Sequence, residues 1–210
     1  MIRPSTGVVR IYGSSPAHHV CIGYVPQRSQ VEWSFPVTVE DVVMMGRVAQ
    51  IGLFRPPGKV DRERVREALE TVGLSDLARR SIRALSGGQQ QRMFIARALA
   101  QDAELLLMDE PLNGLDAPSQ ESILALLDVL RSRGITVMMS THDLEQAAQL
   151  FDKVLLLNRR LIGFGEAGAV LKPERLLRAY GGRLQIVEEE GNLLALGDTC
   201  CEKSPSYEYP

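Results

Sequence analysis

The spacing of hydrophobic positions changes along the chain. Residues 8–12 and 20–25 are short apolar runs that end at turns, so both are predicted strands. From Thr38, which opens a capping-box-like start, apolar residues follow at helical spacing, and residues 61–72 repeat this pattern. We therefore expect a strand-rich beginning followed by a helical block over about residues 38–84.

Beyond residue 85, predicted helices and strands alternate, which is typical of an α/β fold built on a parallel sheet. The helices are expected at 89–100 and 119–131, with a short one from 144, and the strands at 105–109, 135–140 and 154–157. Two short apolar runs then predict an accessory hairpin at about 183–196, and the polar residues 197–210 are expected to be disordered. We assign residues 1–196 to a single α/β domain.

Composition limits the kinds of partner and compartment. A length of 210 residues with 45% hydrophobic residues fits one compact domain. The formal net charge of −2, from 24 basic and 26 acidic residues, gives no support to nucleic-acid binding. Cys21, Cys200 and Cys201 lack the number of a disulfide framework and a metal-ligand spacing, which favours a reducing cytosol. The longest apolar runs are too short to cross a bilayer, so we expect any membrane role to be carried out from the cytoplasmic side through partners.

The string Ser86-Gly87-Gly88-Gln89 opens a predicted helix and is a candidate phosphate contact. Serine and two glycines at a helix start expose backbone N–H groups, and the positive end of the helix dipole adds to their attraction for a phosphate. A plain N-cap with a flexible turn gives the same string. This pattern alone leaves both interpretations open.

Two acidic residues, Asp109 and Glu110, end a strongly apolar predicted strand. Ligands of open α/β sheets bind at the carboxyl ends of the strands. One carboxylate could hold Mg²⁺ through its water shell, and the next could orient and deprotonate an attacking water. The alternative is a solvated strand end without a catalytic role.

Three more polar residues are expected near the same sheet edge. His142 follows the predicted strand 135–140 and could contact a terminal phosphate, although a histidine after a strand is more often structural. Gln27 follows the strand 20–25, where a neutral amide suits a Mg²⁺ shell or a water contact. Asp116 lies in the loop after the two acids and is a candidate nucleotide contact, with a simple turn as the alternative.

Taken in order, these motifs resemble those of ABC ATPases, which have the P-loop NTPase fold. The correspondence covers the Q-loop, the signature, Walker B with its catalytic glutamate, the D-loop and the switch histidine, carried here by Gln27, 85–89, 105–110, Leu115-Asp116 and His142. The resemblance runs from about residue 4 to residue 168 and implies ATP and Mg²⁺ as cofactors. The roles that it implies are Mg²⁺ support by Asp109 and Gln27, water activation by Glu110, γ-phosphate contact by His142, and contact with nucleotide on the opposite subunit by Ser86 to Gln89.

A finer resemblance concerns residues 25–47, which are similar to the ATPase subunits of manganese, zinc and iron importers that work with a cluster-type solute-binding protein. Residues 38–84 would then form the helical subdomain. Its apolar surface near Trp33, Phe35 and Met44-Met45 would receive a coupling helix of the membrane subunit. Ordinary core packing is an equally good explanation of these apolar residues.

The family's phosphate loop, G-x-x-x-x-G-K-S/T, does not occur in the sequence, because the Gly58-Lys59 pair is followed by Val60. The loop's N–H groups and lysine hold the β- and γ-phosphates, so we expect the chain alone not to hydrolyse ATP. A start assigned too late, a shortened gene and a regulatory half are the possible explanations, and retention of Glu110 and His142 favours a late start or truncation. The central strand and its helix should then be absent, which leaves a gap beside residues 105–109 and predicts poor solubility.

The sequence therefore predicts the ATP-binding subunit of an ABC transporter that imports a divalent metal cation. We expect a homodimer at the cytoplasmic face of the plasma (inner) membrane, bound peripherally to permease subunits and served indirectly by an extracytoplasmic metal-binding protein. Two alternatives remain: a non-catalytic partner that completes the ATP site of another subunit, and a soluble ABC ATPase of DNA repair or translation. The sequence identifies neither the metal nor, with certainty, the direction of transport.

Overall fold

The computed structural model describes residues 4–15, 21–52, 54–180, 184–189 and 192–197. Contacts within the chain divide it into two compact units, residues 1–140 and 141–210, which are taken separately below. A single domain over residues 1–196 stays a prediction. No helix in the described parts of the chain is long and apolar enough to cross a membrane.

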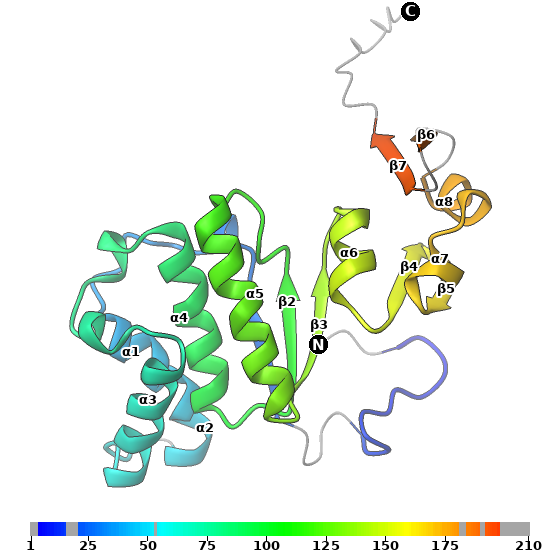
Figure 1. Ribbon diagram of the computed structural model, residues 1–210. Coiled ribbons are helices and arrows are strands. Elements are labelled where there is room, and N and C mark those ends of the chain that lie inside the picture. The colour runs from blue at the N-terminus through cyan, green and yellow to red at the C-terminus, as the bar shows by residue number, and fades with distance from the viewer. Residues whose placement is uncertain (1–3, 16–20, 53, 181–183, 190–191, 198–210) are drawn as a thin grey trace, which may run out of the picture. The chain divides into compact units, whose positions relative to one another are not determined.

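The first unit is organised by a parallel sheet of three strands in the order β1-β2-β3. The strands β2 and β3 are labelled in Figure 1. The strands are β1 (Ile22–Val25), β2 (Leu105–Asp109) and β3 (Thr136–Ser140). Leu106 and Met108 of β2 are buried, as an inner strand requires. The predicted α/β class with parallel strands is confirmed.

Two predictions about strands are wrong. A gap was expected beside residues 105–109, but β2 pairs on both sides, with β1 and with β3. Among the described residues the open edges belong to β1 and β3, because the strand order places β2 in the middle. Residues 8–10 have no regular secondary structure, and residues 11–14 form a turn closed by an isolated bridge between Ile11 and Ser14. Val8 is 81% exposed, so the predicted strand does not form. Whether the open β3 edge lowers solubility stays a prediction.

Helices cover the sheet of this unit in two layers (Figure 1). The inner pair is α4 (Gly87–Ala100), which packs on β1, and α5 (Ala117–Ser132), which packs on β3. On the other side of α4 lie α1 (Val39–Met44), α2 (Val48–Ile51) and α3 (Lys59–Thr71). Short 3₁₀ turns occur at Arg28–Gln30, Met45–Arg47, Ser75–Leu77 and Ile82–Ala84.

The first helix starts as its sequence predicts. The Thr38 hydroxyl accepts a hydrogen bond from the Asp41 N–H at 3.2 Å, and the Asp41 carboxylate accepts from the Thr38 N–H at 2.9 Å. The Thr38 hydroxyl also donates to this carboxylate, which lowers the pKa of Asp41. This capping box satisfies two backbone donors at once and sets where α1 begins.

Arg47 connects the helical block to the end of α4. Its side chain is buried, yet its Nε lies 3.1 Å from Asp61 Oδ1, and its Nη1 lies 2.7 Å from Asp102 Oδ2 and 2.9 Å from the Ala100 carbonyl oxygen. A buried guanidinium needs such partners because isolated charge in the interior is costly. The arginine therefore fixes the start of α3 against the segment that leads into β2.

The second unit has a small core of its own. An antiparallel pair, β4 (Val154–Asn158) and β5 (Arg160–Gly165), packs with short helices through the buried residues Leu156, Val170 and Leu176. These helices are α6 (Leu144–Leu150), α7 (Ala167–Val170) and α8 (Pro173–Tyr180). A further antiparallel pair consists of β6 (Leu184–Glu189) and β7 (Asn192–Gly197), in the span where the sequence predicts a hairpin. The predicted disordered tail lies almost wholly outside the described residues.

Candidate functional site

The carboxyl ends of β1 and β2 bring Gln27 and Glu110 into contact. Gln27 follows β1 by two residues, Glu110 follows β2 directly, and the two strands are neighbours. The amide Nε2 of Gln27 donates a hydrogen bond to Glu110 Oε2 at 3.1 Å. Two residues 83 positions apart therefore meet at the sheet edge where ligands of α/β folds bind.

The backbone at Glu110 is in the left-handed region, with φ of 42°. This region is costly for a residue with a side chain, by about 1–3 kcal/mol, and persists only when neighbours hold it. The Glu110 N–H donates to Ser140 Oγ at 3.1 Å, and Asn113 Nδ2 donates to Glu110 Oε2 at 2.8 Å. Donors from two loops thus hold the Glu110 carboxylate, and an acceptor at the end of β3 holds its backbone N–H.

Asp109 is held from the same side. The Ser140 hydroxyl donates to Asp109 Oδ1 at 2.7 Å, and these two residues are register partners in the ladder between β2 and β3. Within the described residues, no group of three or more His, Cys, Asp or Glu side chains could hold a metal ion. One carboxylate at this edge, with the side-chain carbonyl of Gln27 nearby, suits Mg²⁺, which keeps several waters and takes further oxygens from phosphates.

The signature string forms the predicted N-cap. Ser86 Oγ accepts from the Gln89 N–H at 3.3 Å, and Gln89 Oε1 accepts from the Ser86 N–H at 2.9 Å. A Cβ on Gly87 would lie 2.9 Å from Leu115 Cδ2, and one on Gly88 would lie 2.6 Å from Ser119 Oγ. Both glycines are therefore needed for close packing of α4 against the loop and helix that follow β2, in addition to any contact with phosphate.

Gly88→Ala is expected to lower the free energy of unfolding by about 1–3 kcal/mol, because its methyl group would overlap Ser119. Chemical denaturation of the purified variant measures this change. Gly168→Ala is the matched control, since nothing lies within 4 Å of its added Cβ and it lies in helix α7. If the two variants are equally stable relative to the parent, the close packing at Gly88 is not as described.

The loop after Glu110 is held by hydrogen bonds from α5. Gln120 Nε2 lies 3.2 Å from the carbonyl oxygens of both Leu112 and Leu115, so one amide group bridges both ends of the turn. Asp116 is the N-cap residue of α5, although its side chain makes no capping hydrogen bond. The predicted contact of Asp116 with nucleotide stays a prediction.

Sequence reasoning missed four residues that organise this edge, namely Arg28, Asn113, Gln120 and Ser140. Arg28 Nε donates to Gln90 Oε1 at 2.6 Å, which links the segment after β1 to the signature helix. Asn113 and Ser140 contact the two carboxylates directly. Ser140 could have been predicted from the sequence, because Ser140 and Asp109 both end predicted strands of the same sheet. The contacts of the other three residues depend on loop conformation.

His142 lies two residues beyond the end of β3, in the second unit. The next residue, Asp143, caps α6 by accepting from the Gln146 N–H at 2.9 Å. The convergence of His142 and Glu110 on one phosphate remains a prediction.

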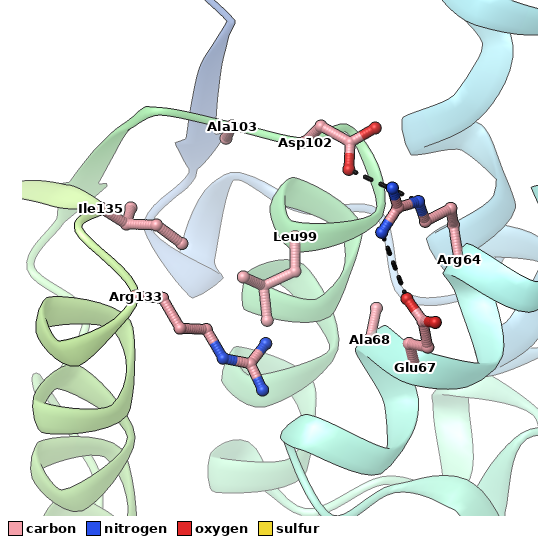
Figure 2. A pocket seen from close by; sticks show the side chains of 8 residues that line it. All are labelled: Arg64, Glu67, Ala68, Leu99, Asp102, Ala103, Arg133 and Ile135. Carbon is pink, nitrogen blue, oxygen red and sulfur yellow. Dashed lines mark hydrogen bonds and ion pairs between the residues drawn. The ribbon is translucent and has the colours of Figure 1, made fainter.

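A cavity of about 240 Å³ lies at the opposite end of the strands (Figure 2). It is bounded by residues that precede β2 and β3 and by the facing side of α3, namely Arg64, Glu67, Ala68, Leu99, Asp102, Ala103, Arg133 and Ile135. Its two arginines are balanced by two carboxylates, and Arg64 is paired with both of them. The cavity therefore lies away from Asp109 and Glu110, which are at the carboxyl end of β2.

A parallel sheet that ends in paired acids, beside a helix that opens on Ser-Gly-Gly-Gln, defines an ATPase domain of the ABC class. Comparison with family models agrees: residues 2–113 match the ABC transporter model, and the chain belongs to this family. Members of the family bind and hydrolyse ATP, which confirms the predicted enzyme class.

Similar proteins include ATP-binding proteins of metal transport systems. The chain is 45% identical over 192 residues to the manganese transport system ATP-binding protein MntB of Halalkalibacterium halodurans, covering 91% of this chain and 77% of that protein. It is 48% identical to the zinc transport system ATP-binding protein TroB of Treponema pallidum, covering 86% and 68%. The chelated iron transport system protein YfeB of Yersinia pestis is 39% identical, covering 92% and 67%.

Solved structures give the same fold. A metal-chelate type ABC transporter in an inward-facing conformation matches with a TM-score of 0.73 at 34% identity, over 85% of this chain and 74% of that chain. The cbiO1 protein of Clostridium perfringens, part of the ABC transporter complex cbiONQ, matches with a TM-score of 0.68 at 27% identity, over 85% and 73%. The predicted ABC ATPase fold is confirmed.

Proposed function

We propose that this chain is the ATP-binding subunit of a transporter that imports a divalent metal cation. Relatives that are 39–48% identical over most of the chain are named for manganese, zinc and iron transport systems. The contact between Gln27 Nε2 and Glu110 Oε2 carries the proposal for the site, because it joins two separate motifs of the family at one sheet edge.

In the proposed reaction, Glu110 accepts a proton from the water that attacks the γ-phosphate. The phosphate loop that would hold this nucleotide is not in the sequence, so we assign the reaction to the assembled transporter and not to the chain alone. Gln27 and Asn113 hold its Oε2 by hydrogen bonds, which orients the carboxylate. Asp109 and Gln27 would hold Mg²⁺ through oxygen atoms and water, and the ion would supply positive charge against the β- and γ-phosphates. His142 contacts the γ-phosphate.

The partners follow from how family members assemble. Two ATP-binding subunits face each other, and Ser86 to Gln89 of one contact the nucleotide on the other. The pair binds permease subunits at the cytoplasmic face of the membrane, and an extracytoplasmic metal-binding protein delivers the cation. Closure of the pair on ATP and reopening after hydrolysis drive the permease.

The decisive experiment measures ATP-dependent Mn²⁺ and Zn²⁺ uptake by proteoliposomes that contain this chain and its permease. Uptake that needs both ATP and the chain supports the proposal. The purified chain is tested in parallel for ATP binding, alone and mixed with an intact ATP-binding subunit. If the chain alone does not bind ATP but raises ATP hydrolysis in the mixture, it is a non-catalytic partner. ATPase activity that responds to nucleic acid but not to the permease would overturn the transport role.

A further inference from the structure

The hydroxyl group of Ser140 bridges the two acidic residues of the site. Its oxygen accepts a hydrogen bond from the Glu110 N–H at 3.1 Å, and its proton is donated to Asp109 Oδ1 at 2.7 Å. Both contacts follow from the ladder register, in which Ser140 is the partner of Asp109 at the ends of β2 and β3. One side chain thus contacts the residue proposed to support Mg²⁺ and the backbone of the residue proposed to activate water.

The chemistry of this bridge requires a hydroxyl. A serine can accept and donate at the same atom, whereas alanine and valine can do neither. The donation to Asp109 Oδ1 is a hydrogen bond to a carboxylate, which is stronger than one between neutral groups. This bond orients the carboxylate and occupies one acceptor position of Oδ1, which leaves Oδ2 and the second lone pair of Oδ1 for a cation or its water shell.

The contact with the Glu110 N–H acts on the backbone instead. Glu110 has φ of 42°, a conformation that residues with side chains adopt rarely, and its N–H donates to the Ser140 hydroxyl. With Ser140 in place, the turn is held and the Glu110 carboxylate stays within reach of Gln27 and Asn113.

We propose that Ser140 is a positioning residue for ATP hydrolysis, which holds the carboxylate of Asp109 and the backbone of Glu110 in one arrangement. This inference rests on the proposed roles of those two residues. Ser140 is exposed and lies outside the hydrophobic core, so its contacts serve the site more than the stability of the fold.

The kinetic test compares Ser140→Ala with Ser140→Thr in the complete transporter. Ser140→Ala is expected to lower kcat about tenfold, the effect of losing a hydrogen bond to a charged group, and to raise the Mg²⁺ concentration needed for half-maximal rate. The KM for ATP should change little, and Ser140→Thr should restore most of the rate because it keeps the hydroxyl. Ser132→Ala is the control, since that exposed hydroxyl bonds only to the Val129 carbonyl among the contacts described, at 2.8 Å.

A second measurement needs no nucleotide. Amide hydrogen exchange at Glu110, followed by NMR on the full chain, should be faster in Ser140→Ala than in the parent and in Ser140→Thr. Unchanged exchange overturns the proposal, as does an Ser140→Ala variant with parental kcat and Mg²⁺ dependence. If amide exchange at Glu110 becomes faster in Ser140→Ala although the parent transporter hydrolyses no ATP, the hydrogen-bonded bridge exists. In that case the proposed function and the role of Ser140 in ATP hydrolysis are both wrong.

Discussion

Glu110→Gln is expected to lower the rate of ATP hydrolysis by about 10²–10³-fold while leaving ATP affinity nearly unchanged. The glutamine keeps the size of the side chain and an oxygen that can accept from Gln27 and Asn113, but it cannot take a proton from water at neutral pH. Phosphate release by the assembled transporter measures the rate, and equilibrium binding of a fluorescent ATP analogue measures the affinity.

Glu121→Gln is the matched control for this experiment. Glu121 lies on the exposed side of α5. Its substitution removes one negative charge, as Glu110→Gln does. Its substitution should leave hydrolysis close to the parental rate. Retention of more than about a tenth of the activity by Glu110→Gln would mean that another group accepts the proton, because a lost general base costs at least two orders of magnitude in typical enzymes.

Arg47→Ala should reduce the free energy of unfolding by about 3 kcal/mol, as expected when one partner of a buried ion pair is removed. The Arg47 side chain is 7% exposed and its partner Asp61 is 15% exposed, so the remaining carboxylate would be poorly hydrated. The Gly58 N–H would still donate to Asp61, which keeps the loss below the largest values known for buried pairs. Urea denaturation with a two-state fit gives the value.

Arg66→Ala tests whether the burial of Arg47 causes the loss of stability expected in Arg47→Ala. Arg66 lies on the same helical block and pairs with Glu63 and Glu70, but all three side chains are more than half exposed. Such surface pairs contribute little, so the midpoint of denaturation should hardly move. Similar losses in Arg47→Ala and Arg66→Ala would show that the buried position of Arg47 has no special effect.

Local patterns predicted much of this fold. The start of α1 at Thr38 and the start of α4 at Ser86 both depend on capping residues that are adjacent in sequence, and both form as expected. The order of the strands could not be predicted from local patterns. Parallel strands are joined by long connections, and these connections do not encode which strand lies in the middle. The expected gap beside β2 failed for this reason.

The residues of the candidate site also fall into those that local sequence patterns predict and those that they do not. Gln27, Asp109 and Glu110 could be found because each follows a predicted strand, and strand ends converge at one edge of a parallel sheet. Asn113 could not be found, because its contact with Glu110 depends on the turn between them and on the left-handed backbone at Glu110. Residues that hold a catalytic group from a loop leave no periodic pattern in the sequence.

The amide of Gln120 has a mechanical consequence. Because it bonds to the carbonyl oxygens of Leu112 and Leu115, on either side of Asn113, it ties this turn to the first turn of α5. Asn113 in turn donates to the carboxylate of Glu110 at 2.8 Å. A displacement of the first part of α5 should therefore shift the donor that Asn113 offers to the Glu110 carboxylate.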